Sequence, residues 1–539
     1  MGVGFAIRVI QDTPRWVLLP TVATTLTVIA FIVYEYIRWS ARVPGFGGPP
    51  GKPIVGNLWQ IRQKDAPEQY RQWAKKYGPV YQIQLGNIPV LVVNAAAAAK
   101  VIFNQNSHAT SSRPEFYTFH KVSPKLGVHS VRVLGSSTDM NLKIISDTAG
   151  TTLGTSPWSE STKRRRKAVA TAVNRPAVAT YIPHLDRETR VFLSEVLRDG
   201  DCGKKGVNPM PLFLRMNMSI GLTLHWGTQM ESQNDLFHEI VYVEDTISNF
   251  RSTTGNLQDY IPFLRLNPGN TQSTQAKDMK IRRDRYMQIL DHDLEDRIAK
   301  GTHKPCIRAN VLVDKEAQLN KLELSSLNLT LLAAGLDTMN SAVSWGLAIL
   351  AKRQDVQEKA LAAIRETYSS SNPLCDAADD QRCAYLVAVI KEILRYYSVT
   401  RLSLPRCTIQ DFVYDNKVIP KGTVIFLNVW ACNMDPELWE DPEVFRPERW
   451  LDSPDSPIFT FGTGSRMCVG TQLAYRELYV LFLRVLNSFR IVPDGMIEDS
   501  PIKGVANPAS LTTQPKAYKV RFVPHHLSAL QDALKQRVE

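Results

Sequence analysis

The stretch Phe461-Gly462-Thr463-Gly464-Ser465-Arg466-Met467-Cys468-Val469-Gly470 is a glycine-rich loop with a single cysteine, and it leads directly into a helical pattern. Gly462 and Gly464 can adopt backbone conformations that a Cβ atom would exclude. We expect Cys468 to lie at the start of the helix, where exposed amide groups and the helix dipole stabilise a thiolate. The loop therefore predicts a cysteine whose ionised form is favoured by its surroundings.

A thiolate held in this way can be the axial ligand of a haem iron, where it favours O–O cleavage. The simpler alternative is a glycine-rich turn with a buried structural cysteine. The full spacing Phe-x-x-Gly-x-Arg-x-Cys-x-Gly favours the haem ligand, because it resembles the haem-binding loop of the cytochrome P-450 superfamily. The resemblance implies a mainly α fold with small β-sheets, haem b (iron protoporphyrin IX) on Cys468, and Phe461, Arg466 and Gly470 beside it.

Length and cysteine usage fit one large domain in a reducing compartment. The chain has 539 residues, and no Ser/Gly-rich linker or repeat divides it after the N-terminal region. Its seven cysteines lack Cys-x-x-Cys spacing, which argues against a disulfide framework or a zinc site. The net charge of +12 indicates an acidic partner or an anionic membrane surface. We expect no nucleic-acid partner.

The N-terminal region reads as a membrane anchor followed by a hinge. Residues 17–34 are apolar and uncharged, close to the roughly 20 residues that span a bilayer. A cleaved signal peptide has a shorter apolar core. We therefore assign residues 1–43 to a single-pass anchor, 44–53 to a Pro/Gly-rich hinge and 54–539 to the catalytic domain. Basic residues flank the run on both sides, so charge does not fix its orientation.

Residues 324–351 form the second informative stretch, an almost wholly apolar helix with one charged residue, Asp337. A second membrane span is the alternative, but several Asn, Ser and Thr residues make it unattractive. A lone carboxylate inside a buried helix is costly and so a functional candidate. The stretch resembles the P-450 oxygen-activation helix. The resemblance implies that Asp337 and Thr338 deliver protons and that Gly335 opens the helix.

Further motifs follow in the order that the family has them. Glu392-x-x-Arg395 places opposite charges on one helix face, and together with Arg449 it resembles the buried structural cluster beneath the haem. Arg406 resembles the strand arginine that binds a haem propionate, and Trp158 the tryptophan that reaches a propionate. Thr162 stands where a basic residue usually follows Trp158, so the cation that partners this propionate is open.

A basic run, Lys163-Arg164-Arg165-Arg166-Lys167, precedes the oxygen-activation helix in sequence. A solvated helix face and a nuclear-localisation signal are the alternatives, and the membrane anchor disfavours the second. In the family this helix lies on the cysteine side of the haem. The resemblance therefore implies that NADPH–cytochrome P-450 reductase docks here and supplies electrons from NADPH. It also implies an endoplasmic reticulum membrane location with a cytosolic catalytic domain.

The finer resemblance is to fungal phenylacetate hydroxylases and to the m-cresol and m-hydroxybenzyl alcohol hydroxylases of patulin-type pathways. It rests on residues 116–121, 154–158, 256–262, 464–468 and 476–479. We expect substrate contacts from an aromatic loop, the oxygen-activation helix and a C-terminal turn, namely Phe116, Tyr117, Phe119, Leu331, Ala334, Met339 and Leu511. Residues 123–145 interrupt the pattern without a clear period, as an insertion or a retained intron.

The sequence therefore favours a membrane-anchored monooxygenase that hydroxylates a small monocyclic phenol in fungal secondary metabolism. A carboxylate in an apolar pocket needs a dedicated cation, and the sequence identifies none, so a phenylacetate-type ring hydroxylase is the alternative. A haem-thiolate isomerase or dehydratase and a non-enzymatic haem protein are further alternatives. Asp337 and Thr338 favour the oxygenase.

Overall fold

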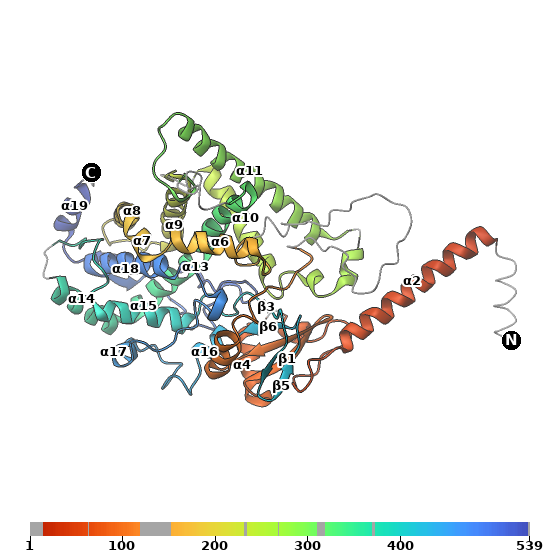
Figure 1. Ribbon diagram of the computed structural model, residues 1–539. Helices are drawn as coiled ribbons and strands as arrows, with labels where there is room; N and C mark the ends of the chain where they lie inside the picture. The colour runs from red at the N-terminus through yellow and green to blue at the C-terminus, as the bar shows by residue number, and fades with distance from the viewer. Residues whose placement is uncertain are drawn as a thin grey trace.

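The architecture is taken from a computed structural model, which describes residues 14–62, 64–118, 152–230, 234–267, 269–309, 319–368 and 372–536. The predicted insertion at 123–145 and Phe119 lie outside the described residues. Helices form most of the molecule, and the sheets are small (Figure 1). The mainly α fold predicted from the sequence is therefore confirmed.

The helices fall into a long and a short group. The long helices of the catalytic body are α4 (Ala66–Tyr77), α6 (Glu160–Ala172), α8 (Ile182–Asp199), α9 (Pro209–Trp226), α10 (Asp235–Arg251), α11 (Thr271–Ala299), α13 (Lys321–Lys352), α14 (Gln354–Tyr368), α15 (Ala384–Tyr397) and α18 (Thr471–Ser488). The short ones are α3 (Leu58–Ile61), α5 (Ala96–Ala99), η1 (Lys100–Gln105), α7 (Arg175–Thr180), η2 (Leu257–Asp259), η3 (Pro262–Leu266), α16 (Val429–Asn433), α17 (Arg449–Asp452), η4 (Gly464–Arg466) and α19 (Leu527–Lys535).

Three small sheets accompany the helices. Strands β1 (Val80–Leu85), β2 (Ile88–Val93), β6 (Val424–Leu427) and β3 (Arg406–Cys407) form one sheet in that order. The first two form a hairpin, closed by a two-residue turn at Gly86, whose φ is +57°. Two-stranded sheets pair β4 (Phe412–Tyr414) with β5 (Lys417–Ile419) and β7 (Phe489–Pro493) with β8 (Val520–Pro524).

Helix α13 runs through the middle of the body, between α9, α15 and α18 (Figure 1). Its first turn carries a capping box, in which Asn320 accepts from the Glu323 backbone amide and the Glu323 carboxylate accepts from the Asn320 amide. Its later turns are apolar on all sides and buried, including Trp345. The helix can therefore carry a functional residue at a fixed position inside the core.

Helix α2 (Arg15–Ser40) projects away from the body and is exposed along most of its length (Figure 1). Its 26 residues extend about 39 Å at 1.5 Å per residue, enough to cross a bilayer. It is the one described helix that is long and apolar enough to do so. An N-terminal apolar helix compatible with a membrane anchor is thus present.

Candidate active site

The glycine-rich loop turns Cys468 back toward Phe461. The Cys468 amide donates to the Phe461 carbonyl at 2.8 Å. Gly462 and Gly464 have φ values of +71° and +70°, as their positions in the loop predict. A Cβ atom on Gly464 would lie 1.9 Å from the carbonyl oxygen of Phe103, so only glycine fits there. Helix α18 begins three residues after Cys468, at Thr471.

A cavity of about 340 Å³ lies between this loop and α13. Cys468 and Phe461 border it on one side, and Leu331, Ala334 and Met339 border it on the other. A Cβ atom on Gly335 would meet nothing within 4 Å, and one on Gly470 would meet only the Cys468 Sγ, at 3.9 Å. These two glycines thus leave open space on both sides of the cavity, which fits a flat cofactor on Cys468.

The protonation of Cys468 differs from the sequence-based expectation. Burial raises the pKa of its thiol, while the Gly470 amide, the Thr471 hydroxyl and the Arg166 guanidinium lower it in part. The helix end therefore does not ionise this thiol by itself. A bound metal cation deprotonates a coordinating thiol outright, so ionisation of Cys468 fits coupling to iron binding.

Buried guanidinium groups at the edge of the cavity point to an anionic ligand. Arg406 and Arg466 both border the cavity, and burial lowers the pKa of each to about 9. Within the described part of the chain, the Nε atoms of both residues and the Nη1 atom of Arg466 have no hydrogen-bond partner. Buried donors are nearly always paired. The two propionates of a haem would supply the missing acceptors, so these residues fit the predicted cofactor.

Arg113 and Arg166 also border the cavity, a position that the sequence does not predict for either residue. The Arg113 Nε donates to the Gly154 carbonyl and its Nη1 to the Pro405 carbonyl, both at 2.9 Å. Burial and nearby arginines lower the pKa of Arg113. It stands before a proline, which favours extended backbone, but no periodicity marks it as a site residue. It is a candidate for the cation left open in the sequence.

Trp158 and Thr162 lie near this edge without lining the cavity. The Trp158 amide donates to the Ser112 hydroxyl at 3.0 Å. The Thr162 hydroxyl donates to the Pro157 carbonyl at 2.7 Å and its side chain is buried. A propionate contact from Trp158 stays a prediction.

Asp337 and Thr338 are neighbours in sequence but face different surroundings. Thr338 borders the cavity, and its hydroxyl donates to the Ala334 carbonyl at 2.7 Å. Asp337 does not border the cavity and instead hydrogen-bonds Ser248 of α10. Burial raises the pKa of Asp337 to about 7. Thr338 can therefore act at the cavity, with a titratable carboxyl behind it.

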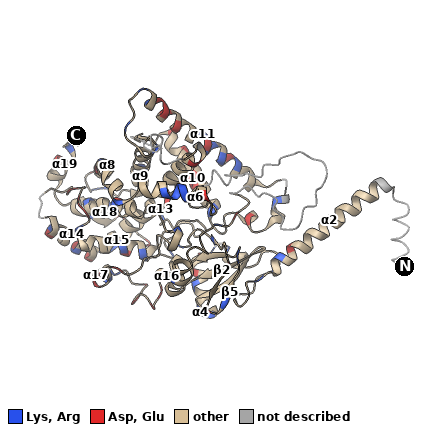
Figure 2. Ribbon diagram, viewed as in Figure 1, with Lys and Arg blue, Asp and Glu red and all other residues tan. Residues whose placement is uncertain are grey.

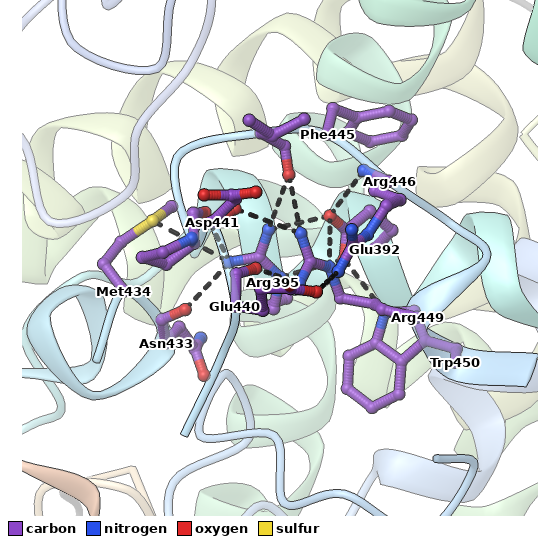
Figure 3. Close-up of polar contacts among 12 residues, drawn as sticks. Glu392, Arg395, Asn433, Met434, Glu440, Asp441, Phe445, Arg446, Arg449 and Trp450 are labelled. Carbon is purple, nitrogen blue, oxygen red and sulfur yellow. Dashed lines mark hydrogen bonds and ion pairs between the residues drawn. The ribbon is translucent and has the colours of Figure 1, made fainter. Parts of the chain in front are cut away.

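Glu392 is the centre of a buried cluster that Figure 3 shows. Its carboxylate accepts from Arg395 at 2.9 and 2.7 Å and from Arg449 at 3.2 Å. It also accepts from the Trp450 indole at 3.0 Å and the Arg446 amide at 2.9 Å. Helices α15 and α17 thus bring together Glu392, Arg395 and Arg449, the three members predicted from the sequence.

The cluster continues to the cysteine loop through one residue, Asn433. The Arg395 Nη1 donates to the Asn433 carbonyl at 2.9 Å. The Asn433 side chain accepts from the Phe459 amide at 2.9 Å and donates to the Thr460 hydroxyl at 3.0 Å. Phe461 follows directly, so the cluster supports the loop that holds Cys468.

The other described residues that were predicted to contact substrate do not line the large cavity. Phe116 packs against Tyr260 with ring centroids 5.5 Å apart and borders a second, smaller cavity. The Arg265 guanidinium lies 4.6 Å from the Tyr117 ring centroid. Leu511 borders neither of the two cavities described here. Substrate contacts from Phe116, Tyr117 and Leu511 stay predictions.

Asn217, His225 and Glu477 also line the large cavity, a position that the sequence does not predict for them. Burial lowers the pKa of His225 to about 4 and raises the pKa of Glu477 to about 8, so both are predominantly neutral near pH 7. Nothing in the helical periodicity separates them from core positions, because each lies on a buried face.

The basic run lies on α6, whose ribbon carries a blue segment in Figure 2. Lys163 and Lys167 are exposed, and the Arg166 Nη2 donates to the Met467 carbonyl at 3.1 Å, which places the helix beside Cys468. Arg165, in contrast, is 1% exposed and donates to the Ser326 and Ser156 hydroxyls. The expectation that Arg165 meets a partner is therefore wrong, since its side chain points into the core.

Comparisons with known proteins agree with this geometry. The Cytochrome P450 family model matches residues 46–133 and 141–522. The chain is 58% identical over 518 residues to the 3-hydroxyphenylacetate 6-hydroxylase of Emericella nidulans, covering 96% of each chain. It is 39% identical over 510 residues to the phenylacetate 2-hydroxylase of the same organism, covering 92% of this chain and 94% of that one.

A solved zebra fish cytochrome P450 structure with abiraterone shares the fold, with a TM-score of 0.66 at 20% identity, over 86% of this chain and 100% of that chain. Enzymes of the family carry haem and generally receive electrons from NADPH through a reductase. The loop, the cavity and the extent of these matches lead to one conclusion: this chain belongs to the cytochrome P450 family and is a haem-thiolate monooxygenase.

Proposed function

We propose that the enzyme hydroxylates the ring of a small arylacetate, with 3-hydroxyphenylacetate as the first candidate substrate. The observation that carries the proposal is the 58% identity, over 96% of both chains, to a protein named 3-hydroxyphenylacetate 6-hydroxylase. The 39% identical relative is named for phenylacetate. Two relatives named for arylacetates therefore reverse the preference for a neutral phenol that the sequence alone favours.

The surroundings of the cavity supply what such a substrate needs. Leu331, Ala334 and Met339 form an apolar wall suited to an aromatic ring. A second cavity of about 40 Å³ shares Arg113 and Leu404 with the large one. Arg251, the last residue of α10, also borders it. A guanidinium at this position can offset the cost of removing a carboxylate from water.

The residues of the chain divide the chemistry as follows. When bound, haem supplies the centre at which one oxygen atom of dioxygen enters the substrate and the other leaves as water. Cys468 holds the iron, and Arg406, Arg466 and Arg113 hold the propionates. Thr338 presents its hydroxyl to the cavity and passes protons inward, and Asp337 supplies them from behind α13.

We assign electron supply to helix α6 and membrane location to helix α2. An NADPH–cytochrome P450 reductase docks against the exposed lysines of α6, Lys163 and Lys167, next to the loop of Cys468. Helix α2 anchors the enzyme as a single-pass protein in the endoplasmic reticulum membrane, with the catalytic body in the cytosol. The apolar length of α2 and the exposed lysines of α6 support this arrangement.

Spectral titration of the purified holoenzyme tests the substrate assignment. 3-Hydroxyphenylacetate and phenylacetate should shift the haem spin state at lower concentration than m-cresol or m-hydroxybenzyl alcohol, and turnover should give a ring-hydroxylated acid. Arg251→Gln should weaken binding of the acids and leave that of m-cresol unchanged, while Arg285→Gln on the exposed face of α11 should change neither. Preferential binding and turnover of m-cresol would instead support the phenol hydroxylase that the sequence favours.

A further inference from the structure

Four consecutive carbonyl groups of α13 each accept a hydrogen bond from a side chain. The Thr338 hydroxyl donates to the Ala334 carbonyl, and the Ser341 hydroxyl donates to the Asp337 carbonyl at 2.8 Å. Between them, the Asn217 Nδ2 of α9 donates to the Gly335 carbonyl at 3.0 Å and the Leu336 carbonyl at 3.1 Å. This turn lies immediately before Thr338, at the cavity.

The orientation of the Asn217 amide is fixed by chemistry. Both of its neighbours are carbonyl oxygens, which can only accept, so the NH₂ group and not the oxygen must face α13. Asn217 is 7% exposed and itself borders the large cavity. In a regular α-helix each carbonyl accepts from the backbone amide four residues later. The Asn217 side chain, which comes from a neighbouring helix, competes with those amides for the Gly335 and Leu336 carbonyls.

α13 remains helical throughout, so Asn217 does not break the helix in this state. If the turn opens toward the cavity, however, its carbonyls lose their partners within α13. Buried carbonyls without a partner are costly, and Asn217 supplies that partner in advance. Gly335 allows the movement, because nothing lies within 4 Å of where its Cβ would be.

We propose that Asn217 is a positioning residue for oxygen activation: by bonding the Gly335 and Leu336 carbonyls, it stabilises the opened form of the α13 turn through which protons reach Thr338. The Asn217 amide nitrogen acts on these two carbonyls of α13. Its loss should therefore change how NADPH is divided between product and peroxide, and not how substrate binds.

Two substitutions of nearly the same shape test the proposal. Asn217→Leu cannot donate, and the isosteric Asn217→Asp cannot donate when ionised. In the holoenzyme with reductase, both should raise peroxide relative to product by about two- to tenfold at neutral pH, the loss expected for one ordinary hydrogen bond or slightly more. The substrate dissociation constant, read from the haem spin state, should stay unchanged. Thr223→Val, a buried change on the same helix away from α13, should leave both quantities unchanged.

The pH profile separates positioning from a general packing defect. The carboxyl group introduced by Asn217→Asp can donate once it is protonated, so this variant should regain coupling as pH falls, whereas Asn217→Leu should not. Other titratable groups on α9 and its neighbours are common to both variants and cancel in the comparison; they include His225 and Arg215, Glu188 and Glu195 of α8, Asp291 of α11 and Asp337 of α13.

Unchanged product per NADPH in both variants would overturn the proposal, and so would an equal loss in Thr223→Val or a weaker substrate affinity. If Asn217→Leu fails to accumulate as holoprotein, Asn217→Asp decides alone: recovery at low pH supports positioning, and a pH-independent defect refutes it.

Discussion

Removing the carboxylate of Glu392 should prevent normal accumulation of haem-loaded enzyme. The side chain is fully buried and accepts five hydrogen bonds, from Arg395 (two), Arg449, Trp450 and the Arg446 amide. Glu392→Ala leaves two arginines of the interior without their shared counter-charge. Breaking a buried ion pair typically costs about 3–5 kcal/mol, a large part of the roughly 5–15 kcal/mol by which proteins are stable.

The substitution should also destabilise the loop that carries Cys468. Arg395 bonds the Asn433 carbonyl, and the Asn433 side chain hydrogen-bonds Phe459 and Thr460. The assay is the yield of reduced, carbon-monoxide-bound holoprotein per unit of total protein, together with the apparent urea midpoint of tryptophan fluorescence. A cost of about 4 kcal/mol corresponds to a change of roughly 10³-fold in the ratio of folded to unfolded protein.

A matched control is available in the same cluster. Glu440 pairs with Arg446 at 2.8 Å, but its side chain is 79% exposed. Exposed pairs contribute little, so Glu440→Ala should leave yield and midpoint unchanged. If Glu392→Ala gave holoprotein at the level of Glu440→Ala, the structural role of the cluster would be refuted.

The remaining predictions concern the cysteine, proton delivery and electron supply. Cys468→Ser should lose the thiolate-type Soret band of the carbon monoxide complex; a surviving band would mean another iron ligand. Thr338→Ala should bind substrate normally but divert NADPH to peroxide, and an unchanged product yield per NADPH would exclude Thr338. Burial raises the pKa of Asp337 to about 7, so it holds its proton below that pH and loses it above. Product per NADPH should therefore fall as pH rises through about 7, and Asp337→Asn should remove that limb of the profile. Changing Lys163 and Lys167 together to Gln should raise the apparent Michaelis constant for reductase and weaken its salt dependence, and a changed substrate affinity would place the lysines elsewhere.

Much of the fold and the centre of the site could be predicted, because they rest on local patterns. The hairpin follows from alternation, and α13 follows from an apolar run of helical length. Gly462 and Gly464 are glycines because their φ values are positive. The residues of the Glu392 cluster come from segments far apart in sequence. Their spacing alone does not predict that they meet, and only the family resemblance grouped them.

The rest depends on which face of an element is buried. Arg165 and Arg166 are adjacent in one basic run, yet one points into the core and the other reaches the loop of Cys468. Arg113 becomes a cavity residue only because its loop meets the strand end at Pro405. Asn217 donates to α13 from a helix more than a hundred residues earlier. Periodicity assigns a buried face to such residues but does not say what that face meets.

Helix α13 separates two environments, so the proton path that we propose crosses its backbone. The cavity side of α13 carries Thr330 and Thr338 among apolar residues, whereas the far side faces Ser248, Asp245, Glu244 and Arg251 of α10. A charged group on the cavity side would repel an apolar ring or bring in water, so the acid is more useful behind the helix. In the proposed mechanism protons pass the turn between Ala334 and Thr338, where side chains already bond four successive carbonyls. Loosening that turn opens a route without exposing the acid to the substrate, and a rigid, fully self-bonded α13 would close it.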